Sequence, residues 1–191
     1  MIRGESNGQR CGSLPPLTLM ADDNGLIEII EIYHEGLTLY LNSIVNNICL
    51  AEELMQDTFL RLAVKKPRFN GRQYFKTWLY SIAKHCAIDY MRKNSKISYF
   101  PIDEAFQMSD EEDIERNYLR EEQKIELHKA IKQLKPDYAQ VLYLKHFEDF
   151  DTAEIASIMK KSKKQVGDLL YRAKNALKAE LEKEGIVYEK L

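Results

Sequence analysis

The segment DTAEIASIMKKSKKQVGDLLYRAK, residues 151–174, decides the fold of the second half of this chain. Asp151 precedes an apolar pattern and Glu154 stands three positions later, an arrangement that caps the N-terminus of a helix. Ser162 and Gln165 repeat the same spacing at the start of a second apolar pattern. Two helices joined by so tight a connection predict a helix-turn-helix.

The second helix of this motif is strongly basic, because six of the residues 160–174 are lysine or arginine. With Val166 at the centre of its buried face, a rotation of about 100° per residue keeps Leu169 or Leu170 and Ala173 inward. The same rotation turns outward Lys164, Gln165, Asp168, Tyr171, Arg172 and Asn175. Lysine and arginine bind phosphates or guanine, and glutamine and asparagine pair with adenine, so this face predicts DNA binding. A solvated basic helix in a helical bundle is the alternative.

Helical periodicity extends over most of the 191 residues, and no alternating strand pattern competes with it. Residues 26–48 read as one long helix or two, and a non-periodic acidic stretch with Pro101 reads as a linker. We therefore expect an all-α protein of two small helical domains joined by an acidic linker, the second domain carrying the helix-turn-helix. The expected divisions are a disordered N-terminal tail at 1–24, a first domain at 25–96, the linker at 97–113 and a second domain at 114–185.

Charge is segregated along the chain although the net charge is only −2. Residues 61–96 hold ten bases and one acid, residues 103–122 nine acids and two bases, and residues 160–178 seven bases and one acid. Such blocks indicate separate surfaces with separate partners, and solubility alone is the alternative.

Cysteine usage and hydropathy exclude several classes of protein. The three cysteines are far apart, and no cluster with histidine has metal-ligand spacing, so we expect no metal, no cofactor and a reducing cytoplasm. No apolar run approaches the ~18 residues of a membrane span, and residues 1–24 lack the apolar core of a signal peptide. We expect a cytoplasmic protein without membrane insertion.

The segment AEELMQDTFLRL, residues 51–62, predicts an amphipathic helix. Its apolar face holds Leu54, Met55, Thr58, Phe59 and Leu62. The opposite face holds Glu53, Gln56, Asp57 and Leu60. Acidic residues around an apolar centre are typical of a helix that contacts another protein, although a single exposed leucine is also ordinary.

A third motif, FKTWLYSIAKHCAIDYMRK, spans residues 75–93. Its expected buried face holds Phe75, Leu79, Ile82, Ala83, Cys86 and Tyr90. Its expected outward face holds Trp78, Ser81, Lys84, His85, Ile88 and Arg92. Bases mixed with aromatic rings suit single-stranded nucleic acid, whose backbone needs positive charge and whose bases stack. The alternative is that Trp78 closes the core.

Taken in this order, the three motifs and the acidic linker resemble bacterial RNA polymerase sigma factors of the small extracytoplasmic-function type. The resemblance covers residues 26–96 and 115–182 and implies a non-enzymatic initiation factor. Its implied partners are core RNA polymerase, promoter DNA in double- and single-stranded form, and an anti-sigma protein. No GxxxxGK[ST] phosphate-binding loop is present. A helix-turn-helix regulator that binds duplex DNA without polymerase, and a helical adaptor without a DNA role, are the rival readings.

The resemblance assigns residues to three surfaces. Those implied to dock on the beta-prime clamp helices of polymerase are Glu53, Gln56, Asp57 and Leu60. Those implied to bind the minus-ten element are Arg68, Asn70, Arg72, Lys76, Trp78, Lys84, His85, Ile88 and Arg92. Those implied to read the minus-thirty-five element are Ser162, Lys163, Lys164, Gln165, Asp168 and Arg172.

Two segments depart from the family pattern. The turn reads Lys160-Lys161-Ser162, where the family commonly has glycine followed by an apolar residue. Residues 167–169 read Gly-Asp-Leu, where many members carry lysine, serine and arginine. Asp168 repels a phosphate unless it accepts a hydrogen bond from a cytosine amine.

Overall fold

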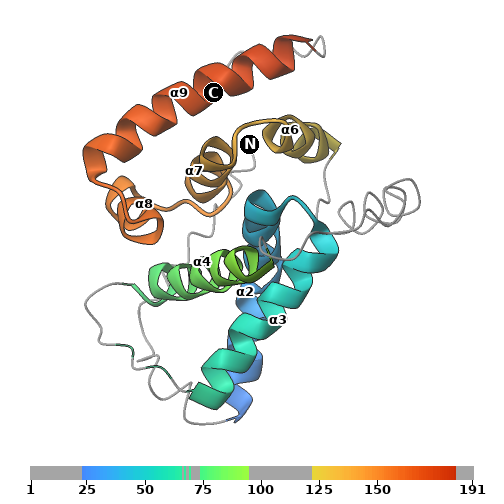
Figure 1. The fold of residues 1–191 in the computed structure, drawn as a ribbon, viewed down its shortest axis with the longest axis vertical. Coiled ribbons are helices and arrows are strands. Elements are labelled where there is room, and N and C mark those ends of the chain that lie inside the picture. The colour runs from blue at the N-terminus through green and yellow to red at the C-terminus, as the bar shows by residue number, and fades with distance from the viewer. Residues whose placement is uncertain (1–22, 66, 68, 70–73, 95–121, 184–191) are drawn as a thin grey trace, which may run out of the picture.

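The computed structural model describes residues 23–65, 67, 69, 74–94 and 122–183. This part of the chain is helical without strands, which confirms the all-α prediction (Figure 1). Its seven helices are α2 (Asp23–Val45), α3 (Ile48–Lys65), α4 (Phe75–Asn94), α6 (Glu122–Lys132), α7 (Pro136–His146), α8 (Thr152–Met159) and α9 (Lys163–Lys183). Helices α2–α4 form the first domain and α6–α9 the second.

The first domain begins with a single long helix. α2 runs to Val45 and ends where Asn46 takes a left-handed conformation with φ 53°. The Asn47 side chain then accepts a hydrogen bond from the Leu50 N–H at 2.7 Å and caps α3. α2 starts at Asp23, within the stretch 1–24 expected to be a tail, while the rest of that stretch and the linker 97–113 lie outside the described residues.

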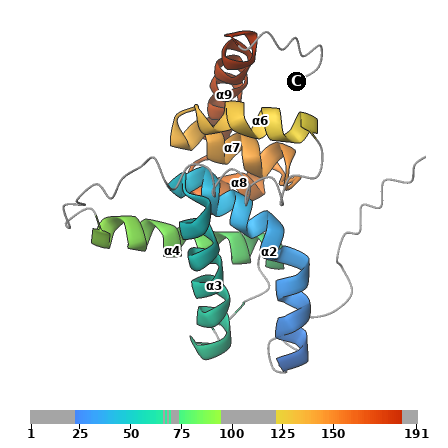
Figure 2. The same cartoon turned by 90° about the vertical axis from the view of Figure 1, so that its right-hand side faces the viewer.

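Helices α3 and α4 pack on α2, and α4 lies across α3 (Figure 2). All five residues of the expected apolar face of α3 are buried. α4 is buried on more than the expected face, because Thr77 and Tyr80 are 1% and 0% exposed. A helix with two buried faces must have a second packing partner.

Capping chemistry builds the second domain. Pro136 starts α7 in its first turn, where a missing N–H costs nothing. The Asp151 carboxylate accepts from the Glu154 N–H at 2.8 Å and the Glu154 carboxylate accepts from the Asp151 N–H at 2.9 Å, so α8 has the predicted capping box. At the start of α9 the Ser162 hydroxyl accepts from the Gln165 N–H, and the Gln165 side-chain oxygen accepts from the Ser162 N–H.

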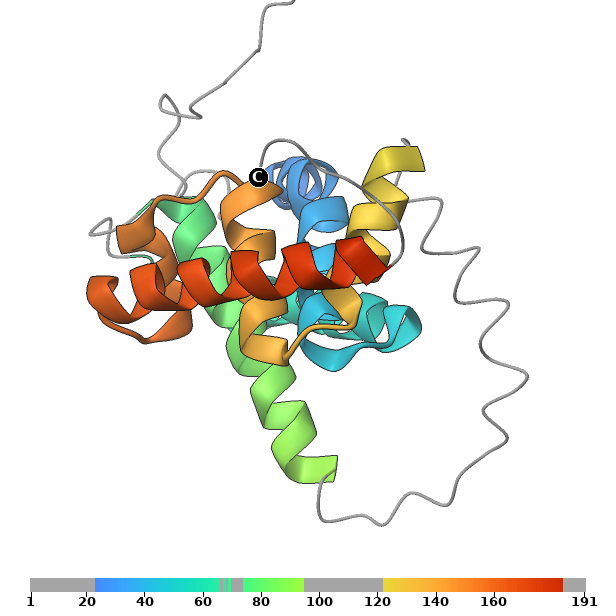
Figure 3. The same ribbon diagram turned by 90° about the horizontal axis from the view of Figure 1, so that it is seen from above.

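The two domains pack directly on each other, which the sequence did not indicate. α2 contacts α7 and α4 contacts α8, while α9 lies on α7 at the far side of the second domain (Figure 3). Tyr40 and Tyr80 of the first domain belong to the same apolar cluster as Tyr143 and Phe150 of the second. Among the helices of the described residues, none is long and apolar enough to cross a membrane.

Candidate protein and nucleic-acid interfaces

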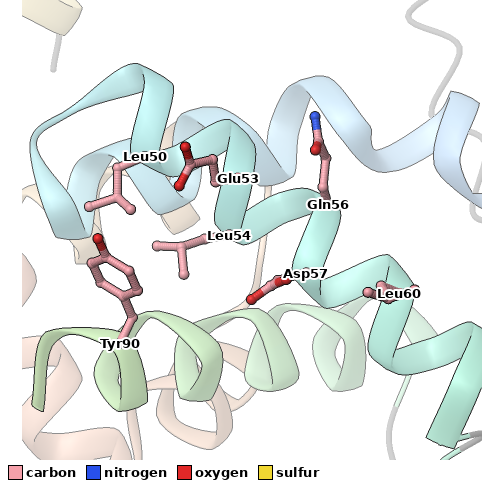
Figure 4. A pocket seen from close by; sticks show the side chains of 7 residues that line it. All are labelled: Leu50, Glu53, Leu54, Gln56, Asp57, Leu60 and Tyr90. Atoms are coloured by element: carbon pink, nitrogen blue, oxygen red, sulfur yellow. The ribbon is translucent and has the colours of Figure 1, made fainter. Parts of the chain in front are cut away.

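The outer face of α3 carries an open hollow of about 490 Å³ (Figure 4). Four of its lining residues are the ones the sequence placed on this face, and all four are exposed: Glu53, Gln56, Asp57 and Leu60. The Leu60 side chain is 59% exposed although it is large and apolar. Leu50 and Leu54 of α3 and Tyr90 of α4 complete the lining.

This surface combines an apolar floor with acidic edges, a pattern suited to a protein partner that carries basic residues around an apolar centre. Sequence reasoning missed the contributions of Leu50 and Tyr90. Tyr90 was assigned to the buried face of its helix, which is correct for part of its ring because it is half-buried. Tyr90 also reaches the rim of the hollow because of the way α4 crosses α3. The crossing of two helices cannot be predicted from the residue pattern of α4 alone.

Along α4, the expected outward residues divide into two environments. His85, Ile88 and Arg92 are exposed, and the Arg92 guanidinium pairs with Asp89 at 3.2 Å. Trp78 is instead half-buried in an aromatic cluster, with its ring centroid 5.3 Å from that of Phe69 and 5.6 Å from that of Phe75. The outward face that the sequence predicted for this helix is therefore exposed at its C-terminal end and packed at its N-terminal end.

Two basic residues of α4 face the second domain. The Lys76 ammonium lies 2.9 Å from the Glu148 carboxylate and donates a hydrogen bond of 2.9 Å to the Glu148 carbonyl oxygen. Burial lowers the pKa of Lys84 below its usual value; nearby Asp137 raises it, and Lys161 and Lys160 lower it. Arg68, Asn70 and Arg72, which precede α4, lie outside the described residues.

The basic face of α9 is fully open to solvent. All six of the outward residues expected there are exposed, and the Tyr171 side chain is 71% exposed. Val166 and Ala173 are buried as expected, and Leu177 is buried as well. Leu169 and Leu170 are both half-buried, so both leucines, and not one of them, pack toward the core. Ser162 and Lys163, at the start of the helix, are exposed as well.

The turn of the helix-turn-helix contains a strained residue. Lys160 has φ 54° and ψ 45°, the left-handed conformation that glycine adopts without penalty. Its N–H bonds to the Ala156 carbonyl and the Lys161 N–H to the same oxygen at 3.0 Å, which closes α8. The Lys161 ammonium pairs with Asp137 of α7 at 3.1 Å and ties the turn to the domain.

Within the part of the chain that the structure covers, no group of three or more His, Cys, Asp or Glu side chains could hold a metal ion.

Comparison with known protein families identifies both domains. Residues 29–97 match the description "Sigma-70 region 2" and residues 124–177 match "Sigma-70, region 4". One curated relative is the RNA polymerase sigma factor YlaC of Bacillus subtilis, 27% identical over 166 residues that cover 86% of this chain and 96% of the relative. Another is the ECF RNA polymerase sigma factor SigX of Bacillus subtilis, 27% identical over 160 residues, covering 81% of this chain and 82% of the relative.

Solved structures with the same fold include two complexes. The sigma factor RpoE in complex with the anti-sigma factor NepR, from Bartonella quintana, has a TM-score of 0.61 at 19% identity and covers 82% of this chain and 96% of its own. CnrH in complex with the cytosolic domain of CnrY has a TM-score of 0.61 at 17% identity and covers 87% of this chain and 97% of its own. At these identities the likeness concerns the fold.

Proposed function

The chain belongs to the sigma-70 family of RNA polymerase sigma factors, in its extracytoplasmic-function class, and we propose that its three surfaces divide the work of promoter recognition. A sigma factor binds core RNA polymerase, recognises promoter DNA and helps to melt the minus-ten region, without catalysing a reaction itself. The two matched regions in succession favour this role over a regulator that binds duplex DNA alone, because such a regulator has no need for region 2.

The observation that carries the proposal is the hollow on α3, which offers a docking surface separate from both basic helices. We assign Glu53, Gln56, Asp57 and Leu60 to contact with the beta-prime clamp helices of polymerase. Support comes from the grouping of the exposed Leu60 with three other apolar residues in the lining of one hollow, Leu50, Leu54 and Tyr90. The α9 surface, including Ser162 and Arg172, is assigned to the minus-thirty-five element in the major groove.

We assign the α4 surface and the loop before it to the minus-ten strand. The bases there supply charge for the phosphate backbone, and the cluster around Trp78 supplies flat apolar rings. Stacking one unpaired base on such a ring stabilises the complex by about 1–3 kcal/mol. Opening a duplex costs on average ~1.4 kcal/mol per base-pair step, so each captured base offsets roughly one opened step.

The proposal also includes a regulatory partner, the acidic linker and the domain limits 25–96 and 114–185. Because two solved relatives are bound to an anti-sigma factor or to a cytosolic domain, we propose that an anti-sigma protein holds this chain in the cytoplasm. Carboxylates of the linker are assigned to a basic channel of polymerase, where they take the place of nucleic acid.

Run-off transcription tests the function directly. Purified chain and core polymerase from the same bacterium are incubated with a library of its promoter fragments, and transcripts are sequenced at their 5′ ends. Start-site-specific RNA that depends on the chain supports the proposal. Footprints on duplex DNA without polymerase, together with no transcript, would instead identify a regulator of the rival class.

A further inference from the structure

We propose that Asp168 selects a cytosine in the minus-thirty-five element, so that a carboxylate chooses one base pair of the promoter. The inference rests on the function proposed above and names a base that the α9 surface reads. Asp168 is the single acid of residues 160–178, which also hold seven bases. An acid in the middle of a surface assigned to DNA either weakens the binding or has a specific group to bind.

Asp168 lies on the side of α9 opposite the core of the second domain. Helix α9 itself is at the outer edge of the fold (Figure 1). Val166 and Leu177 on its inner side are 0% and 1% exposed. At about 100° per residue, Asp168 lies about 200° from Val166 and about 180° from Leu177 around the helix axis. The carboxylate therefore stands on the centre line of the exposed face, in the N-terminal part of the helix, where a recognition helix contacts base edges.

The carboxylate of Asp168 is not neutralised by its own helix. Its neighbours three and four positions away on this face are all exposed: Lys164, Gln165, Tyr171 and Arg172. A carboxylate four residues from a lysine or arginine can pair with it on a helix surface. Within the described residues, however, the ion pairs of α9 lie at its other end, Lys178–Glu182 at 3.8 Å and Lys183–Glu180 at 2.6 Å. The Asp168 carboxylate is therefore available to a donor outside the protein.

Cytosine is the base whose major-groove edge suits a carboxylate. Guanine presents the two acceptors N7 and O6, and thymine presents the O4 acceptor and a methyl group. Adenine presents its N6 amine beside the N7 acceptor, which repels a carboxylate, whereas cytosine presents the N4 amine alone. An ionised carboxylate accepts hydrogen bonds and donates none. It is therefore matched to cytosine, and it is repelled by the phosphates because both groups are negative.

The basic neighbours of Asp168 extend the match to a cytosine–guanine pair. Lys164 and Arg172 lie about one turn before and one turn after Asp168 on the same face. The guanine of the pair presents N7 and O6 in the same groove, and lysine or arginine donates to both atoms. A carboxylate flanked by two cations thus complements a base pair that presents a donor beside two acceptors.

Gly167 lets the short Asp168 side chain approach a base. Aspartate has one methylene between its backbone and its carboxylate, so the backbone of α9 must come close to the floor of the groove. A Cβ added at Gly167 would meet nothing within 4 Å among the described residues, so packing does not require this glycine. Glycine is also one of the least favourable residues inside a helix. Its position beside Asp168 is suited to a close approach between backbone and ligand.

Selection of DNA tests the base preference. The full chain, carrying an affinity tag, is mixed with core polymerase and with promoter fragments whose minus-thirty-five element is randomised, and the retained DNA is sequenced. We expect cytosine to be enriched about tenfold at one position, a discrimination typical of one good base contact. Asp168→Ala should lose that enrichment at this position alone. Asp168→Asn should shift it to adenine, because an amide pairs with adenine N6 and N7.

Glu182→Ala is the matched control, because it removes one negative charge from an exposed position farther along the same helix. It should leave every base preference unchanged. All variants should keep the helical circular dichroism of wild type, since each change is on the exposed side of α9. An absence of cytosine enrichment with wild type, or the same enrichment with Asp168→Ala, would overturn the proposal.

A change in the DNA tests the contact at the level of one group. In a fixed promoter the selected cytosine is replaced by 2-pyrimidinone, which lacks the N4 amine. The wild-type complex should lose about tenfold more affinity than the Asp168→Ala complex does. The altered base pair is the same for both proteins, so the difference between the two losses isolates the contact. Equal losses would rule out a bond between Asp168 and the amine.

Failure of the proposed function is distinguishable from failure of this inference. If core polymerase makes no RNA with the wild-type chain, the proposed function fails. The DNA recovered through the tag still shows whether Asp168 selects a cytosine, because the recovery depends on binding and not on transcription.

Discussion

Replacing Lys160 by glycine should stabilise the protein, although it removes a basic residue from the DNA-binding domain. Lys160 is held at φ 54°, and the left-handed conformation costs a residue with a side chain about 1–2 kcal/mol. Glycine has no such cost, but it raises the conformational entropy of the unfolded chain, which lowers the stability by roughly 0.4–1 kcal/mol. With the middle of each range, the net gain is about 0.8 kcal/mol. For a chain of this length, about 2–4 °C per kcal/mol gives a rise in Tm of about 2–3 °C.

The assay compares Lys160→Gly with Lys160→Ala by thermal unfolding under circular dichroism. Alanine removes the same charge and keeps a Cβ, so the difference between the two variants isolates the backbone effect. Both variants lose one cation that faces solvent beside the α9 surface. If that cation contacts a phosphate, the slope of log K against log salt for DNA binding falls by about 0.9 in each variant.

Equal melting temperatures for the glycine and alanine variants would refute the reasoning, because they would mean that φ 54° carries no cost in this turn. The result would also bear on the departure from the family pattern. Relatives commonly have glycine at this turn. This chain has a lysine there although the lysine lowers the stability, and we interpret the lysine as a cation placed next to the DNA.

Three further predictions concern the other surfaces. Leu60→Asp should abolish binding to core polymerase in a pull-down, while its Tm stays within about 1 °C of wild type. The control Ile32→Asp, which also changes an exposed apolar residue, should bind normally. Retained binding by the Leu60 variant would remove α3 from the docking surface. Lys164→Glu should erase the footprint over the minus-thirty-five element, whereas Lys178→Glu, farther along α9, should not; an intact footprint excludes Lys164 from the contact. Asp151→Ala should lower the stability by about 0.5–2 kcal/mol in urea unfolding through loss of the cap, and no change would mean that the capping box is not maintained in solution.

Local signals in the sequence were sufficient for much of this structure. The pairs Asp151–Glu154 and Ser162–Gln165 form the predicted caps, because a capping box involves only residues three apart. The buried face of α3 also follows from helical spacing alone. Neither inference needs to know where any other helix lies.

What escaped prediction depends on segments that are far apart in the chain. Thr77 and Tyr80 lie off the apolar face of α4, and they are buried because α8 and Phe150, in the segment between α7 and α8, cover them. The hollow beside Leu60 takes part of its wall from Tyr90, which the crossing of two helices places there. The end of α2 at Asn46 rests on a single left-handed residue, for which asparagine is only one of several candidates.

Glu154 shows how a local signal and a distant contact coexist in one side chain. One carboxylate oxygen accepts from the Asp151 N–H and closes the cap of α8, while the other accepts from the Thr77 hydroxyl of the first domain. A carboxylate has lone pairs enough for both bonds, so the cap can be read from the sequence whatever the second oxygen binds. The cap of α8 and the contact between the domains therefore share one side chain without competing for the same oxygen.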